Sequence, residues 1–372
     1  MYPHGFDRAN AESPFLNFVA REFNERGTQR RRELAQKIIS HPFVASLGLR
    51  VPQRLAVLDD IQDLRSAELP ETFVLKPASG WSSRGVMLLE RHGENDFFDH
   101  MGLRGYSIES IAESQSGTSA PPTSKADRRW IVEELVQPSI NVGVVPFDYK
   151  FYCFDGEVAL ITQTDRNTGP TKVVLFDGQF KPLRLGTDYL FAGKAKPGVP
   201  VVPLHAPEML WWAQKLSSVA DSPFVRIDLF DSPTGPVFGE FTYSPGGTHN
   251  RTYVFSHALI DQFDEYITST SPAADPLVET PLAARTSLVH PAPHHFRAWA
   301  GYAYNGGPRG AERLSAFYRE QAQASDPDGT DAEWYRRMSG RWAAIRDGLW
   351  SDNRRSVTVV RPAKKSALKV RA

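Results

Sequence analysis

Residues 224–247 read FVRIDLFDSPTGPVFGEFTYSPGG and contain two runs, 224–230 and 238–243, in which polar and apolar residues alternate. Such alternation is typical of β-strands, and the Gly/Pro-rich segment 233–236 between the runs is typical of a turn. The stretch therefore predicts two strands joined by a tight connection.

Charged side chains on these two runs give the first chemical signal. Arg226 and Asp228 lie on the same face of their strand, and the turn could return Glu240 beside Asp228. Two carboxylates there could hold Mg²⁺, which prefers hard oxygen ligands supplied by protein and phosphates together. The alternative is a structural ion pair between Arg226 and one carboxylate. Backbone N–H groups of Gly246 and Gly247 could bind an oxyanion, or these glycines could form a simple turn.

A strand followed by a loop of small residues lies upstream. Residues 72–75 are rich in β-formers and end at Lys76, the loop 78–85 follows, and the apolar run 86–89 comes next. Small residues let backbone N–H groups approach phosphate oxygens, and a nearby ammonium neutralises those oxygens. The loop matches neither common glycine-rich phosphate motif, so Lys76 could also be an exposed residue of a hairpin.

Further β-rich runs predict a mixed, largely antiparallel sheet. Asp-Gly pairs mark turns between them, and Trp and Leu at helical spacing in 207–219 predict a helix that packs on the sheet. Glu133 and Glu134 lie in a run that could line an adenine slot or form a surface strand. The runs are 130–136, 149–154, 158–162 and 172–176.

The N-terminal part predicts a small α/β lobe. Residues 21–39 combine charged residues with apolar residues at helical spacing, which predicts one amphipathic helix limited by His41-Pro42. Residues 43–70 predict a helix, a glycine turn, a short strand at 55–58 and another helix.

Three other segments lack the strand pattern. Residues 107–127 are rich in Ser, Pro, Thr and Ala and predict an exposed loop. Beyond residue 268 a Ser/Pro/Ala-rich stretch leads to helix-prone segments, 311–323 and 331–349. The basic stretch 353–372 contains no acidic residue and predicts a disordered tail, which could alternatively touch an anionic partner.

The composition of the 372 residues excludes several classes of protein. Lys plus Arg and Asp plus Glu both total 43, so no global charge favours nucleic acid or an anionic membrane. No bilayer-length apolar run and no signal-peptide core are evident, which predicts a cytoplasmic protein. Cys153 is the only cysteine, so neither an intrachain disulfide nor a cysteine-based zinc site can form, and we expect a buried thiol. The cluster His290, His294 and His295 is interrupted by prolines and predicts a linker rather than a metal site.

Taken together, five segments resemble the ATP-grasp family, and more narrowly its teichuronopeptide biosynthesis (TupA-like) branch. The resemblance covers about residues 30–255, roughly two thirds of the chain. The segments are LAQKIISHPFVASLGLRVP, LPETFVLKPASG, WIVEELV, FDYKFYCFDGEV and FVRIDLFDSPTGPVFGEFTYSPGG.

The resemblance implies an α/β (α+β) ATP-grasp fold with a mixed, largely antiparallel catalytic sheet. The implied division is an N-terminal α/β lobe (1–70), a lid subdomain (71–136) with a flexible insert (107–127), a catalytic subdomain (137–268), a helical extension (269–352) and a basic tail (353–372).

The resemblance also implies roles for individual residues. ATP phosphates would meet Lys37, Lys76 and the lid-loop residues Ser79, Ser82, Ser83 and Gly85. Adenine would meet Glu133, Glu134, Leu135 and Val136. Lys150 would lie near the transferred phosphate, and Arg226 would steady the substrate carboxylate and the tetrahedral intermediate. Magnesium would be held by Asp228, Glu240 and Thr242, the last standing where the commoner family pattern has Asn. Substrate candidates are His249, Asn250 and Arg251, which could instead form a polar turn.

The implied function is that of an ATP-dependent carboxylate–amine ligase, which forms an amide through an acyl phosphate and releases ADP. The cofactors would be ATP and two Mg²⁺ ions, and the substrates would be an acid and an amine. The amide would belong to a natural product or a cell-surface polymer. The protein could form a homodimer. A kinase on the same scaffold and a non-catalytic nucleotide-binding scaffold are the alternatives.

Overall fold

A computed structural model describes residues 4–24, 27–78, 83–116, 129–140, 143–167, 169–193, 195–246, 252–269 and 308–327, and single residues between 332 and 347. The chain divides into two compact units, Met1–Phe296 and Arg297–Ala372. In the described part of the chain, no helix has the length and hydropathy needed to cross a membrane.

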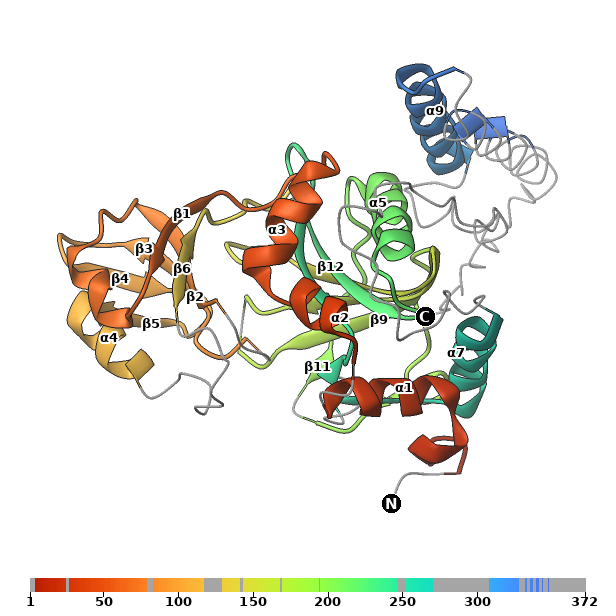
Figure 1. Cartoon of the computed structure of the whole chain (residues 1–372), viewed down its shortest axis with the longest axis horizontal. Helices are drawn as coiled ribbons and strands as arrows, with labels where there is room; N and C mark the ends of the chain where they lie inside the picture. Colours follow the sequence, from red (N-terminus) through yellow and green to blue (C-terminus); the bar gives the residue numbers. More distant parts are fainter. Residues whose placement is uncertain are drawn as a thin grey trace, which may run out of the picture. The chain divides into compact units, whose positions relative to one another are not determined.

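The centre of the first unit is a six-stranded sheet that we call the central sheet (Figure 1). Neighbouring strands are antiparallel except for the β11–β9 pair, which is parallel, so the predicted mixed, largely antiparallel sheet is confirmed. In sheet order the strands are β11 (Lys196–Pro197), β9 (Lys172–Asp177), β8 (Glu157–Asp165), β7 (Asp148–Phe154), β12 (Val225–Ser232) and β13 (Gly235–Thr242).

Helix α5 (Ala206–Val219) packs on β12, β7 and β8, as its Trp and Leu spacing predicts (Figure 1). Its inward residues include Met209, Leu210 and Leu216, all buried. Because the helix covers one face of the central strands, side chains that point to the other face are available to line a site.

A second six-stranded sheet, here the lid sheet, is antiparallel throughout. Its core includes Phe73 and Phe97, whose rings meet edge to face with centroids 5.5 Å apart. In sheet order the strands are β1 (Arg54–Leu58), β6 (Trp130–Glu133), β2 (Thr72–Pro77), β3 (Met87–Arg91), β4 (Asp96–Asp99) and β5 (Arg104–Ser107), and the 3-10 helix η2 (Ile61–Ser66) follows β1.

The single helix predicted over 21–39 is wrong. The structure has three helices, α1 (Pro14–Phe23), α2 (Gln29–Leu34) and α3 (Lys37–Ser46). The Thr28 side chain accepts a hydrogen bond from the Arg31 N–H and starts α2, because an N-cap residue satisfies a free amide of the first turn. Helix α3 also passes through His41-Pro42, which was expected to limit the helix.

The exposed loop predicted over 107–127 is wrong in its first half. Helix α4 (Ile108–Ser116) occupies that part, and residues 117–127 lie outside the described residues. Ile108, Ile111 and Ala112 are spaced for one helix face and are buried against the lid sheet, so packing overrides the polar composition.

The N- and C-terminal helices of the first unit pack on each other. Asp264 in α7 (His257–Ser269) accepts hydrogen bonds from the Ser13 hydroxyl at 2.7 Å and from the Phe15 N–H at 2.9 Å at the start of α1. A two-stranded sheet, β10 (Tyr189–Phe191) with β14 (Tyr253–Phe255), and the 3-10 helix η1 (Asn10–Glu12) complete this region.

In the second unit, the helix expected over 311–323 is α9 (Pro308–Ala324). Tyr318 on this helix is buried, and its ring stacks on that of Tyr335 at a centroid distance of 6.4 Å. The basic tail, the histidine cluster at 290–295 and most of 331–349 lie outside the described residues.

Candidate functional site

The hairpin of β12 and β13 brings the two predicted carboxylates together. Asp228 and Glu240 are direct partners in the antiparallel register, as the sequence alternation predicts. The register shifts between Asp228 and Leu229, because Gly239 is an extra residue on β13. A Cβ atom on Gly239 would lie 3.1 Å from the Asp228 carbonyl oxygen, so this close approach of the strands favours glycine.

A row of polar side chains continues across the sheet from this hairpin. Lys150 on β7 is the partner of Asp228, and Thr162 on β8 is the partner of Lys150, so all lie on one face with Glu240. The Lys150 ammonium donates to both Asp148 Oδ2 and Asp228 Oδ2. The residue predicted near the transferred phosphate therefore lies beside a predicted metal ligand.

Arg226 forms the ion pair that the sequence left as an alternative. Its Nε and Nη2 donate to the two Asp228 oxygens at 2.7 and 2.8 Å, and Nη2 also contacts Glu240 Oε1 at 3.1 Å and Thr242 Oγ1 at 2.9 Å. Burial works against its charge, but Asp228 and Glu240 outweigh burial and raise the pKa of Arg226. Arg226 thus holds the predicted metal ligands and lies outside the residues that line the cavity described below.

Helix α3 supplies a further cation. Its first residue, Lys37, donates to Glu240 Oε2 at 2.7 Å. One turn later, His41 is buried and its Nε2 lies 3.0 Å from the carbonyl oxygen of Gly239. The helix is thus attached to β13 at the bulge residue, Gly239, and at the residue that follows it.

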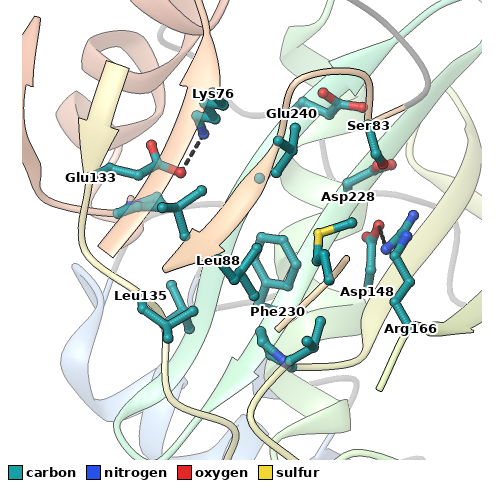
Figure 2. Close-up of a pocket in the computed structure, with 18 of the residues that line it drawn as sticks. Lys76, Ser83, Leu88, Glu133, Leu135, Asp148, Arg166, Asp228, Phe230 and Glu240 are labelled. Carbon is teal, nitrogen blue, oxygen red and sulfur yellow. Dashed lines mark hydrogen bonds and ion pairs between the residues drawn. The ribbon is translucent and has the colours of Figure 1, made fainter. Parts of the chain in front are cut away.

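The lid sheet contributes a second ion pair. Lys76 and Glu133, on the neighbouring strands β2 and β6, are both buried and form an ion pair (Figure 2). Burial lowers the pKa of Lys76, and Glu133 only partly offsets this effect. Lys76 is therefore not the exposed hairpin residue of the alternative interpretation.

Between the two sheets lies one cavity with both polar and apolar walls (Figure 2). The predicted strand 130–136 ends at Glu133, and beyond it the Glu134 N–H donates to the Gln53 carbonyl oxygen at 2.9 Å. Glu134 also lines the cavity, and its Oε1 accepts a hydrogen bond from Arg50 Nη2. The apolar wall includes Val74, Leu88, Leu135, Val136, Val145 and Phe230.

Two of the described lid-loop residues have left-handed backbone. Ser83 and Gly85 have φ angles of 56° and 72°, and Ser83 lines the cavity. A Cβ atom on Gly85 would come within 3.0 Å of Pro77 and 3.1 Å of Trp130, so this position favours glycine. Gly246 is half-buried and is absent from the cavity lining. Ser79, Ser82, Gly247, His249, Asn250 and Arg251 lie outside the described residues.

The two central carboxylates differ in how easily they ionise. Burial raises the pKa of Asp228 to about 6, although Arg226 and Lys150 act in the opposite direction. Burial acts on Glu240 too, but Lys37, Arg226 and Lys150 outweigh it and hold the pKa of this carboxyl well below its usual range. The cations present therefore do not fully offset the burial of Asp228, and a divalent cation would do so.

The donor set fits Mg²⁺. Asp228 and Glu240 are hard oxygen ligands on paired strands, and both line the cavity. In the described ranges, no three or more His, Cys, Asp and Glu side chains are grouped to hold a metal, so phosphate oxygens and water would complete the shell, as Mg²⁺ prefers. Thr242, predicted as a third ligand, is absent from the cavity lining and contacts Arg226.

Two cavity residues, Asp148 and Arg166, were missed from the sequence. Arg166 Nη1 lies 3.3 Å from Asp148 Oδ2. The alternation of β7 could have indicated Asp148, which lies two positions before Lys150 and thus on the same face. Arg166 follows the end of β8, where strand periodicity no longer says which way a side chain points.

Three solved structures are similar to this chain at low sequence identity. D-alanine–D-alanine ligase from Helicobacter pylori is 15% identical over 64% of this chain and 61% of its own, with a TM-score of 0.37. The ATP-grasp ligase PsnB, complexed with minimal precursor, is 14% identical over 69% and 68%, with a TM-score of 0.37. A RiPP-associated ATP-grasp ligase from Chryseobacterium gregarium, in complex with ADP and a leader and core peptide, is 11% identical over 66% and 62%, with a TM-score of 0.35.

The match thus spans about three fifths of the Helicobacter pylori enzyme. No curated protein matches the sequence. The family model for TupA-like ATP-grasp proteins matches residues 17–265, which include both six-stranded sheets and every cavity residue described above. The chain therefore belongs to the TupA-like ATP-grasp family.

Proposed function

We propose that this protein is an ATP-dependent carboxylate–amine ligase that forms an amide through an acyl phosphate. The observation that carries the proposal is the row Lys150, Asp228 and Glu240 across three neighbouring strands, facing a cavity whose other side holds Lys76. Transfer of the terminal phosphoryl group of ATP redistributes negative charge. Cations in the cavity can offset this charge, and carboxylates there can bind a metal ion that does the same.

Two lysines of the cavity form ion pairs with carboxylates, and a bound nucleotide could offer these lysines phosphate oxygens as partners. Lys76 is paired with Glu133, and Lys37 with Glu240. Mg²⁺ on Glu240 would replace the positive charge of Lys37 when that ammonium moves to a phosphate oxygen. Lys76 has three N–H donors and could contact phosphate while keeping Glu133, so neither carboxylate would be left buried without a cation. We assign Lys37 and Lys76 to the ATP phosphates on this ground.

The apolar wall suits the adenine ring. Leu88, Leu135 and Phe230 line the cavity (Figure 2), and we assign the hinge after β6 to adenine. An apolar slot with a few polar backbone groups is the common form of a nucleobase site. The lid-loop residues Ser83 and Gly85 would close over the phosphates and exclude water, which would otherwise hydrolyse an acyl phosphate.

Mg²⁺, when bound by Asp228 and Glu240, would offset the negative charge that accumulates as the terminal phosphoryl group is transferred. Lys150, beside Asp228, would contact that phosphoryl group. Arg226 would keep the two carboxylates aligned through its contacts with both. The substrate carboxylate would attack the phosphorus, ADP would leave, and an amine would then replace phosphate at the activated carbonyl.

The presence of a full charged set also bears on the alternatives. A non-catalytic scaffold has no physical need for Lys76, Lys150, Arg226, Asp228 and Glu240 together. A kinase would need the same set, so a product must be measured to separate a kinase from a ligase.

The test is a reaction of the protein with ATP, Mg²⁺, hydroxylamine and a mixture of amino acids, short peptides and uronic acids, analysed by mass spectrometry with ADP quantified in parallel. Hydroxylamine traps an acyl phosphate as a hydroxamate. We expect a hydroxamate and ADP from the wild type, and neither from Asp228→Asn, while nucleotide affinity changes far less. The matched control is Asp261→Asn on α7, where the Asp is exposed and paired with Arg8, and we expect normal activity.

The outcomes separate the three functions. A stable phosphorylated product with ADP and no hydroxamate would favour the kinase. ATP binding with neither product would favour the scaffold. Unchanged turnover in Asp228→Asn would contradict the metal assignment.

A further inference from the structure

The cavity contains an arginine, Arg166, that has no role in the proposed binding of ATP and Mg²⁺. Arg166 lines the cavity, and its contact with the described residues is a single one, 3.3 Å from Nη1 to Asp148 Oδ2. A guanidinium has five N–H donors in a fixed plane. Among the described residues, most N–H donors of Arg166 therefore have no acceptor and could serve a ligand.

The loop that presents Arg166 is held firmly in place. The next residue, Asn167, donates from Nδ2 to the Val145 carbonyl oxygen at 2.8 Å and accepts from the Val145 N–H at 2.9 Å. Its Nδ2 and backbone N–H also reach Asp165 Oδ1, at 3.1 and 2.9 Å. The two bonds to Val145 fix the backbone on one side of Arg166 to the chain that enters β7, and the two bonds to Asp165 hold the turn itself, so Arg166 belongs to a built site rather than to a free loop.

One carboxylate oxygen of Asp148 forms ion pairs with two cations. Its Oδ2 accepts from both the Lys150 ammonium and Arg166, while its buried Oδ1 has no hydrogen-bond partner among the described residues. These two cations outweigh burial and hold the pKa of Asp148 below its usual value. Lys150 also pairs with Asp228, so the charges have to be counted over the whole connected group. Its four cations, Lys37, Lys150, Arg166 and Arg226, outnumber its three carboxylates, Asp148, Asp228 and Glu240, and this excess of positive charge attracts an anion.

The position of this group separates it from the other cations. Figure 2 shows Asp148 and Arg166 beside Asp228, with the Lys76–Glu133 pair at another corner of the cavity. Lys150 links the two regions, because it contacts Asp148 and Asp228 at once. An anion on Arg166 would therefore lie next to the group that we assign to the transferred phosphoryl.

We propose that Arg166, positioned by Asp148, binds the carboxylate of the acid substrate; this inference rests on the proposed function. The planar guanidinium matches a carboxylate and leaves lone pairs on its oxygens for attack. In that step a bond forms between a carboxylate oxygen and the terminal phosphorus of ATP, and the bond from that phosphorus to the bridging oxygen breaks. ADP leaves with that electron pair, so no further reactant is needed.

The test compares Arg166→Gln and Arg166→Lys with the wild type in the ADP-release assay, using serial dilutions of the same acid mixture. A charge-assisted hydrogen-bond pair contributes enough that we expect the apparent KM for the mixture to rise about 10- to 100-fold in Arg166→Gln. The apparent KM of Arg166→Lys should lie between those of the wild type and Arg166→Gln, because this variant keeps the positive charge but loses the planar guanidinium. The KM for Mg-ATP, and Mg-ADP binding by calorimetry, should stay within about twofold. Arg184→Gln, in an exposed loop, is the matched control.

Both variants should fold, because Asp148 keeps Lys150 when Arg166 is removed. An unchanged KM for the acids would overturn the inference. A KM for Mg-ATP that rises as much as that for the acids would assign Arg166 to the nucleotide and would also overturn it.

Failure of the proposed function is distinguishable, because the wild type would then form neither ADP nor hydroxamate. In that case acetate serves as the carboxylate probe for Arg166. The unfolding temperature is measured at increasing acetate concentrations, with Mg-ADP present and at constant ionic strength. Saturable stabilisation of the wild type that is lost in Arg166→Gln is expected. Equal stabilisation of both would overturn the carboxylate site.

Discussion

His41 should make the stability of this protein sensitive to mild acid. Burial lowers the pKa of His41 from 6.5 to about 3, and the nearby ammonium of Lys76 adds to this effect. The neutral ring donates from Nε2 to the Gly239 carbonyl oxygen, which can only accept. The unfolded chain takes up a proton below pH 6.5 and the native ring does not, so stability is retained above that pH and lost as the pH falls.

The magnitude follows from the two pKa values. Each pH unit between 6.5 and 3 lowers the free energy of unfolding by about 1.4 kcal/mol, which gives about 2 kcal/mol at pH 5 relative to neutral pH. His41→Gln cannot titrate and keeps an N–H donor. We therefore expect the variant to lose about 2 kcal/mol less than the wild type when moved from neutral pH to pH 5.

The assay is equilibrium unfolding in guanidinium chloride at neutral pH and at pH 5, followed by circular dichroism. The control is His92→Gln, because His92 is exposed in the segment between β3 and β4, and it should behave as the wild type does. Parallel losses in His41→Gln and the wild type would refute the reasoning. Titration of the native His41 ring near pH 6.5 in an NMR experiment would refute it too.

Two further changes test the buried groups. Lys76→Met should lower the free energy of unfolding by about 3–5 kcal/mol, because it leaves Glu133 buried and unpaired. The double variant with Glu133→Leu should regain most of that loss. A loss below about 1 kcal/mol for Lys76→Met, measured by unfolding in guanidinium chloride, would contradict this expectation. The Cys153 thiol is buried, and burial raises its pKa, so Ellman's reagent should modify it only after denaturation, and fast reaction with the native protein would count against this assignment.

Much of the fold follows from local patterns. The alternation in 224–243 is enough to pair Asp228 with Glu240, because strand periodicity and a short turn determine which residues oppose each other. The helices were predicted less well. Composition made 21–39 look continuous, although Gly27-Thr28 is a capping signal, and polar residues concealed the buried face of α4.

The site could be predicted only in part, for a physical reason. Lys37 and Glu240 are 203 positions apart, and their contact depends on how α3 docks on β13, which no local pattern records. Arg166 lies just past a strand end and is directed by the bonds of Asn167 to Val145. Local periodicity assigns residues to faces, whereas tertiary packing decides which faces meet.

The connection between the two sheets has a mechanical consequence. The buried ion pairs of Lys76 and of Arg226 each lie within one sheet, so hinge motion need not break them. Arg50 instead joins Glu134, at the end of the lid sheet, to Thr234 in the turn of the β12–β13 hairpin, and its side chain is 43% exposed. Exposed ion pairs are weak and are screened by salt. Ionic strength should therefore act on the Arg50 contact directly, so that salt weakens this connection between the two sheets while the charged groups within each sheet keep their partners.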